Sequence, residues 1–146
     1  VDHNGAYARP AKQSQQRVKK ALKLLTKRNR GISLTRMFEE IQRKMRGWLQ
    51  YYSIGKLTDF IQRLDKWLRV RIRQYIWKQW KKFKTKVTNL QKLRLSQHDA
   101  HVFASTRKGY WRTAHSKTLS YSLTNRKLEQ LGLMNMSKTL QSIQCD

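Results

Sequence analysis

The sequence predicts an all-α protein, in which a bundle of three helices is followed by a small module of short helices. Apolar residues recur every three or four positions through most of the first 82 residues, which is the spacing of one face of an α-helix. The 146 residues include one proline and six glycines, so few positions break helices and the connections are expected to be short. Amphipathic helices joined in this way pack into a bundle by their apolar faces.

The first two helices are predicted on either side of the sequence NRG, residues 29–31, which is a plausible helix stop. Between Gln13 and Lys27 an apolar stripe is formed by Val18, Ala21, Leu22 and Leu25. Lysines outside that stripe are Lys19, Lys20, Lys23 and Lys27. Ser33 offers an N-cap to the second helix. The core stripe of the second helix is Leu34, Met37, Phe38, Ile41, Met45, Trp48, Leu49 and Tyr52. Trp48 is expected to be buried against the third helix.

The third helix is expected to begin after Gly55, with Thr58 or Asp59 as its cap. Its main apolar face is Ile61, Leu64, Leu68, Ile72, Tyr75 and Ile76. A shorter apolar line of Trp67, Val70 and Trp77 widens that face. The remaining face holds Lys66, Arg69 and Arg73, and its flanks carry Arg63 and Arg71.

The periodicity weakens after Lys82, and shorter helices are predicted there. They cover about Val87–Leu93, Asp99–Ala104, Lys117–Ser122 and Asn125–Leu131. The sequence TRKGYW and Gly132 interrupt them. The predicted organisation is a linker or cloning remnant at residues 1–10, a helical bundle at 11–82 and a small basic helical module at 83–146.

The charge balance points to a polyanionic partner. The chain has 33 Lys and Arg against 8 Asp and Glu, a formal charge of +25. Such a charge opposes compaction unless a polyanion neutralises it, so nucleic acid is the first candidate partner. An anionic membrane surface is the second candidate, and solubility alone is the third. The apolar content of 38 % and the five tryptophans describe a folded domain, and no apolar run approaches the length of a membrane span.

The sequence gives no basis for catalysis by this chain alone. Glu39 and Glu40 are adjacent on a helix, so their side chains diverge and cannot act as a general acid and base pair. No pair of acids indicates a two-metal carboxylate site. His98 and His101 lack a third ligand at a metal-binding spacing, and Cys145 has no nearby partner. No catalytic residue, metal or cofactor is therefore predicted. A single cysteine is typical of a reducing, intracellular compartment.

A basic track is the strongest candidate site. Ten cations against one acid, Asp65, lie between residues 63 and 86: Arg63, Lys66, Arg69, Arg71, Arg73, Lys78, Lys81, Lys82, Lys84 and Lys86. Phosphates offset the repulsion among them, with release of counterions. Trp80 and Phe83 lie where the long helix is expected to end. They either anchor the second module, losing most of their solvent contact, or stack on bases.

The sequence STRKGYWRTAHS combines cations and aromatics a second time. The candidate nucleic-acid-binding residues here are Arg107, Lys108, Tyr110, Trp111 and Arg112. Gly109 between them allows close approach of backbone to a phosphate.

Several of these stretches resemble the C-terminal part of group II intron-encoded reverse transcriptases, also called maturases. The matching stretches are RGWLQYYSIG, LDKWLRVRIRQYIWKQWKKFKTKVTNLQKL and RKGYWRTAHS, in this order. The earlier RPAKQSQQRVKKALKLLTKRNRGISLTRMFEEI is similar to the opening of the maturase-specific segment. The resemblance covers about Arg9 to Leu133, whereas LRLSQHDAHVFAS, with its two histidines, departs from the family pattern.

The resemblance implies a thumb domain, or domain X, followed by a small DNA-binding region. Partners that it implies are group II intron RNA, a DNA or RNA/DNA template–primer duplex, and the palm and fingers of a parent reverse transcriptase. The family's catalytic aspartates lie in a YADD-type palm motif that this chain lacks, and the zinc-dependent endonuclease module is missing too. The implied location is the bacterial cytoplasm, or alternatively an organelle matrix, with no membrane partner.

Two other interpretations stay open at this point. One is a polymerase that uses this piece as part of a longer chain. The other is a generic basic helical protein, which binds nucleic acid without intron specificity or serves as a structural or membrane-surface protein.

Overall fold

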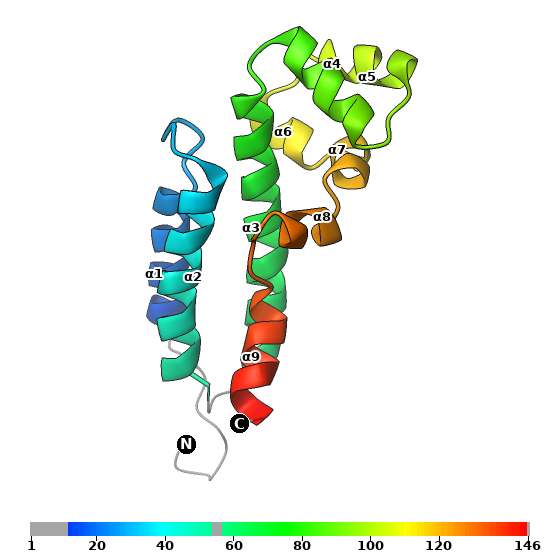
Figure 1. Cartoon of the computed structure of the whole chain (residues 1–146). Helices are drawn as coiled ribbons and strands as arrows, with labels where there is room; N and C mark the ends of the chain where they lie inside the picture. The colour runs from blue at the N-terminus through cyan, green and yellow to red at the C-terminus, as the bar shows by residue number, and fades with distance from the viewer. Residues whose placement is uncertain (1–11, 54–56, 146) are drawn as a thin grey trace.

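The computed structural model describes residues 12–53 and 57–145, and in these residues every regular element is an α-helix (Figure 1). The helices are α1 (Lys12–Leu25), α2 (Leu34–Tyr51), α3 (Thr58–Gln79), α4 (Phe83–Lys92), α5 (Gln97–Ala104), α6 (Tyr110–Ala114), α7 (Lys117–Ser122), α8 (Asn125–Gln130) and α9 (Met136–Cys145). The all-α prediction is confirmed. The linker predicted at residues 1–10 and Gly55, after which the third helix was expected to begin, lie outside the described residues.

The three long helices form the bundle that the apolar stripes predict. Val18 and Leu22 of α1 are buried, as are the five central stripe residues of α2. On α3 the whole predicted face is buried, namely Ile61, Leu64, Leu68, Ile72, Tyr75 and Ile76. Trp48 is only partly buried, and it reaches the first turn of α3, where its ring lies 5.7 Å from that of Phe60.

The caps of α2 and α3 differ. The Ser33 hydroxyl accepts a hydrogen bond from the Arg36 amide at 3.2 Å, so the predicted N-cap of α2 is confirmed. The predicted cap of α3 by Thr58 or Asp59 is wrong, because the helix begins at Thr58 and its N-cap residue Leu57 makes no capping side-chain hydrogen bond. Leu57 is 1 % exposed, so burial of an apolar side chain determines where α3 begins.

Helices α4 to α8 form a group beside the C-terminal half of α3 (Figure 1). Trp77, 2 % exposed, anchors this group, since its ring lies 5.1 Å from that of Phe103 on α5. The sequence assigns the anchor to Trp80 and Phe83 instead. Trp80 is partly buried beside Trp77, but Phe83 is 47 % exposed, so the expected loss of solvent contact is wrong for Phe83. The α6 helix, which the sequence analysis missed, packs against α3.

The last helix returns to the bundle, which the sequence analysis did not predict. Gly132, with a φ of +113°, turns the chain after α8, a conformation that glycine adopts without steric cost. Helix α9 then packs against both α2 and α3, and it buries Met136 and Leu140 (Figure 1). The module predicted at 83–146 therefore ends in a helix that completes the core of the bundle.

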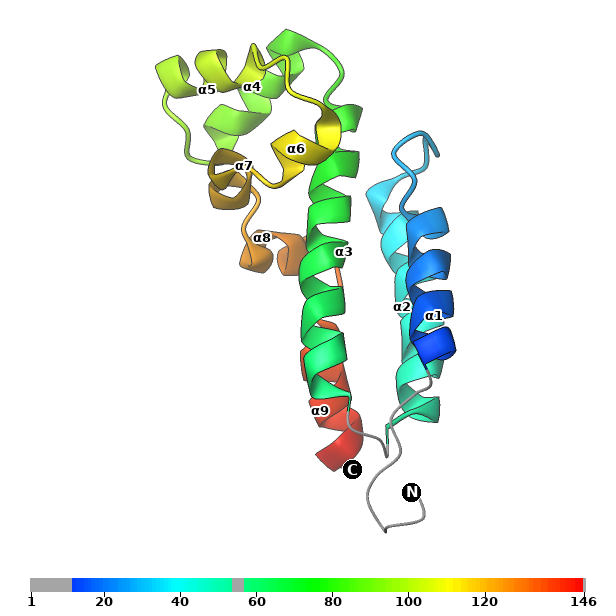
Figure 2. The same ribbon diagram turned by 180° about the vertical axis from the view of Figure 1, so that it is seen from behind.

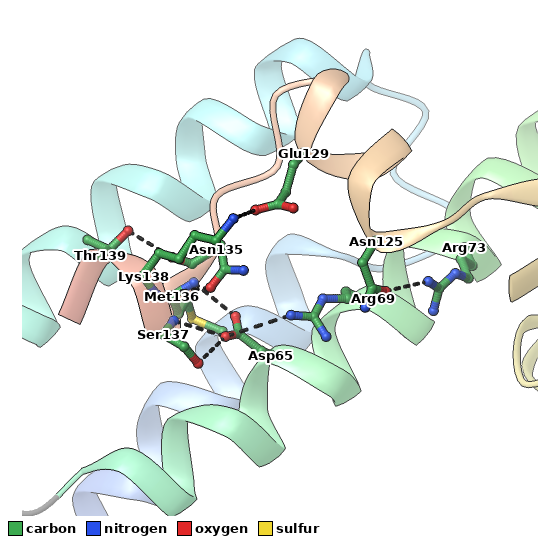
Figure 3. Close-up of polar contacts among 10 residues, drawn as sticks. All are labelled: Asp65, Arg69, Arg73, Asn125, Glu129, Asn135, Met136, Ser137, Lys138 and Thr139. Carbon is green, nitrogen blue, oxygen red and sulfur yellow. Dashed lines mark hydrogen bonds and ion pairs between the residues drawn. The ribbon is translucent and has the colours of Figure 1, made fainter. Parts of the chain in front are cut away.

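Buried Asp65 of α3 caps the N-terminus of α9 (Figure 3). Its carboxylate accepts hydrogen bonds from the amides of Met136 and Ser137, both at 3.0 Å, and from the Ser137 hydroxyl at 2.7 Å. The Asn135 side chain accepts a bond from the next amide, that of Lys138. The first three amides of α9 thus all have partners, although the helix itself supplies none. The negative carboxylate also interacts favourably with the positive end of the helix dipole.

Arg69 and Arg73 extend this polar row along α3 (Figure 3). Arg69 lies 3.9 Å from the Asp65 carboxylate. Arg73 donates to the Leu123 carbonyl at 2.8 Å and to the Asn125 side chain at 2.9 Å. Burial, followed by the charge of Arg69, lowers the pKa of Arg73. Arg73, predicted on the remaining face of α3 as a nucleic-acid-binding residue, is 6 % exposed and holds the segment between α7 and α8.

Removing the α9 cap tests the role of Asp65. We expect Asp65→Ala to lower the free energy of unfolding by about 1–3 kcal/mol, because buried amides lose their acceptors. Amide exchange should accelerate first in residues 136–145. Urea denaturation and hydrogen exchange measure the two effects. Glu39→Ala, at an exposed acid of α2, is the control. Unchanged exchange in α9 would refute the capping role.

The anchor of the α4–α8 group is tested by a pair of aromatic variants. Trp77→Ala should cost about 3–5 kcal/mol, the usual range for removal of a buried large aromatic side chain. Phe83→Ala should cost clearly less, since about half of this ring already contacts solvent. Equal losses in chemical denaturation would mean that Phe83 shares the anchor after all.

Candidate nucleic-acid interface

A groove of about 950 Å³ runs between α1 and α3, and its lining contains cations and no acid. Figure 2 shows the two helices side by side, with α6 next to the upper part of α3. The lining residues are Gln16, Lys19, Lys20, Lys23, Leu24, Lys27, Arg28, Asn29, Trp67, Arg71, Gln74 and Trp111. We call this space the α1–α3 groove.

The lysine wall of the groove follows from the amphipathicity of α1. Val18 and Leu22 point into the core, so the residues at helical spacing on another side form a separate face. Lys19, Lys20 and Lys23 of α1 line the groove, and Lys27, just past the end of the helix, lines it too. The sequence analysis placed these lysines outside the apolar stripe but did not count them as a site. Their spacing was the available signal, and the denser charge after residue 63 obscured it.

Arg71, a predicted nucleic-acid-binding residue of α3, donates hydrogen bonds to the end of α1 and so joins the two walls of the groove. Its guanidinium donates to the carbonyl of Lys23 at 2.9 Å and to the hydroxyl of Thr26 at 3.1 Å. These acceptors lie at the C-terminal end of α1, where a cation also interacts favourably with the helix dipole. Burial, followed by the charge of Arg28, lowers the pKa of Arg71. Arg71 therefore contributes charge to the groove while its hydrogen bonds hold α1 on α3.

Trp67 lies in the groove with cations over its ring. The Lys19 ammonium is 5.1 Å and the Arg71 guanidinium 5.7 Å from the ring centroid. Both contacts are cation–π interactions, which keep the charges close to an apolar surface. Beyond Trp67 the groove continues into a shallower depression of about 280 Å³, lined in part by Lys12, Phe60 and Arg63. Arg63, one of the predicted nucleic-acid-binding residues, thus lines this depression next to the α1–α3 groove.

The predicted residues at the end of α3 and on α4 lie apart from the lining of the groove. Lys81, Lys82 and Lys84 are exposed, and Lys78 is half-buried. Lys86 extends over the Trp77 ring at 4.6 Å, and burial lowers its pKa. The predicted continuous track from residue 63 to 86 is therefore divided. Lys66 is exposed on α3, whereas Arg69 and Arg73 make the internal contacts described above.

The predicted residues around α6 are divided between two surfaces. Trp111 is 39 % exposed and lines the upper end of the α1–α3 groove. Tyr110 packs under Arg28, whose guanidinium is 5.1 Å from the ring centroid. Lys108 and Arg112 line a second groove of about 1020 Å³, together with Arg94, Lys117 and Tyr121. Arg107 is exposed. Helix α6 thus lies between two basic grooves.

The described residues hold no group of three His, Cys, Asp or Glu side chains placed to bind a metal ion. His98 and His101 are both exposed, and His101 contacts the Gln97 carbonyl at 2.7 Å and the Phe83 ring. In the same part of the chain, no helix has the length and apolar character needed to cross a membrane.

Comparison with known proteins assigns the family. No curated protein matches the chain. The model of the maturase-specific domain of group II introns matches residues 15–96, more than half of the 146 residues. The matched segment contains α2, α3 and α4 and nearly all of α1, and it therefore includes both long walls of the α1–α3 groove. The chain belongs to the family of the group II intron maturase-specific domain.

Proposed function

We propose that this chain is a non-catalytic module that binds group II intron RNA through the α1–α3 groove and so promotes splicing. The observation that carries the proposal is an acid-free, lysine-lined groove within the segment that matches the maturase-specific domain. Its lysines supply the charge, and Arg71 and Trp67 hold the two walls at a fixed separation. Such a rigid basic surface stabilises a folded RNA by neutralising phosphates that otherwise repel one another.

The remaining basic surfaces fit the other partners expected of a thumb domain. The exposed Lys81, Lys82 and Lys84 and the second groove offer further phosphate contacts at the C-terminal end of α3. We propose that they bind a template–primer duplex when the chain lies beside the palm and fingers of a reverse transcriptase. A parent protein of this kind acts in the bacterial cytoplasm or in an organelle matrix, where group II introns are spliced.

Burial of the apolar stripes argues against the membrane-surface interpretation. A helix that binds the surface of a bilayer needs an unpartnered apolar face. The stripes of α2 and α3 are buried in one core cluster, and both helices pack against α9. The alternative interpretation that stays open is a generic nucleic-acid-binding protein without intron specificity.

The lysine wall is tested by the salt dependence of RNA binding. The triple variant Lys20→Gln, Lys23→Gln, Lys27→Gln should flatten the slope of log K against log[salt] by about two to three units, since each lost phosphate contact removes about 0.7–0.9. A filter-binding series at several salt concentrations measures the slope.

A matched control keeps the change in net charge and moves it elsewhere. Arg43→Gln, Lys44→Gln and Arg46→Gln remove three exposed cations of α2 that do not line the groove. We expect a much smaller change in slope for this variant. Equal slopes for the two triple variants would show that binding depends on net charge and not on the groove.

Specificity for the intron is tested by competition. A group II intron RNA should displace a labelled copy of itself at least tenfold more effectively than an unrelated structured RNA of equal length, at the same salt concentration. Equal competition would favour the generic nucleic-acid-binding protein. A parallel flotation assay with anionic liposomes should show no binding at that salt concentration.

A further inference from the structure

One buried polar side chain of the α1–α3 groove lacks a partner. Gln74 follows Trp67 and Arg71 on the same face of α3, lines the groove and is 6 % exposed. Within residues 12–53 and 57–145, its carboxamide makes no hydrogen bond, and its polar atoms are not sealed from solvent. Buried polar groups almost always have partners, because leaving one unpaired costs free energy. The Gln74 amide, on the lining of the groove and without a protein partner, is thus available to hydrogen-bond a ligand.

Two exposed apolar side chains, one of them aromatic, line the upper end of the same groove. Trp67 is already covered by Lys19 and Arg71, but Trp111 is 39 % exposed and Leu24 is 54 % exposed. A T-shaped contact with His115, with ring centroids 4.7 Å apart, holds the Trp111 indole in place. The phosphates of a duplex make no use of an exposed indole or leucine. An unpaired base, in contrast, can stack on such an apolar surface.

The lysine wall supplies the third element of a nucleotide site. Lys20 lies on α1 and Lys27 lies just past the end of this helix, and both line the groove. They can contact the backbone on either side of a nucleotide whose base enters between α1 and α3. The groove therefore combines cations, an open ring and an amide that offers both a donor and an acceptor.

We propose that the α1–α3 groove takes one unpaired nucleotide of the bound RNA, with its base on Trp111 and its edge hydrogen-bonded to Gln74. This inference rests on the proposed function and adds the kind of RNA element that the groove accepts. A glutamine amide matches the adjacent donor and acceptor on the Watson–Crick edge of adenine, the N6 amino group and N1. In a duplex the Watson–Crick edge is paired and the base faces are stacked, so a loop, bulge or single strand fits where a helix does not.

Two RNA probes and two variants test the inference. The probes are an eight-nucleotide oligo(A) and an eight-base-pair blunt RNA duplex, both at the same low salt concentration. Gln74→Met keeps the size of the side chain but removes its hydrogen bonds, and Trp111→Ala removes the ring. Each variant should weaken oligo(A) binding about tenfold and duplex binding less than twofold. Gln62→Met, at an exposed position of α3 outside the groove, is the matched control and should change neither affinity.

Fluorescence and thermal melting separate binding from folding. A 2-aminopurine within the oligonucleotide should be quenched by the parent protein and by Gln62→Met, and quenched less by Trp111→Ala. Gln74→Met should melt at or above the temperature of the parent protein, because it removes an unpaired buried amide.

The outcomes distinguish this inference from the proposed function. If the parent protein binds neither probe nor intron RNA, the proposed function fails and this inference fails with it. If the parent binds RNA but Gln74→Met and Trp111→Ala bind oligo(A) like the parent, only the unpaired-nucleotide site is overturned. Equal losses for oligo(A) and duplex, or a lower melting temperature for Gln74→Met, also overturn it, because the residues then support the surface as a whole.

Discussion

The contact of Asp65 with the start of α9 holds this last helix on the bundle. This carboxylate is 3 % exposed and satisfies two amides and a hydroxyl of residues 136 and 137. Burying an isolated carboxylate is very unfavourable, so these bonds and nearby Arg69 must compensate its lost hydration. Because the cap orients α9, Met136 and Leu140 reach the core and cover α2 and α3. The polar contact thereby decides which apolar surfaces meet.

Arginines and lysines have different tasks in this chain. Arg30, Arg71 and Arg73 donate to carbonyl oxygens inside the fold. The fork of a guanidinium suits such contacts, whereas an ammonium is strongly hydrated and remains at the surface. Glu40, on α2, is held by Arg30, whose hydrogen bond lowers the pKa of this carboxyl. Among the described residues, Glu40, Asp65 and Glu129 lie within ion-pair distance of cations, and none of these three acids lines the α1–α3 groove.

Helical periodicity predicted the bundle because buried apolar residues recur at helical spacing over several turns of each long helix. The faces of α2 and α3 could be read from sequence for that reason. Helix α9 could not, because its place depends on Asp65, seventy-one residues away along the chain from Met136.

The candidate site was also predictable only in part from the sequence. Counting cations selected Arg63, which lines the smaller depression beside the groove, but it also included Arg73, since density of charge does not reveal which arginine meets a carbonyl. The lysines of α1 were missed because the groove exists only when α1 lies beside α3.

The position of Trp111 has a consequence for where this domain ends. The segment that matches the family stops at residue 96, yet the upper end of the groove is formed by α6, and the core of the bundle is completed by α9. A polypeptide trimmed to the matched segment keeps the lysine wall but leaves apolar surface of α2 and α3 uncovered. Such a truncated protein is prone to self-association, and under the proposed function its RNA binding would depend on the lysines alone, without Trp111 at the end of the groove. The segment that matches the family is therefore shorter than the stretch of chain that forms the groove and the core of the bundle.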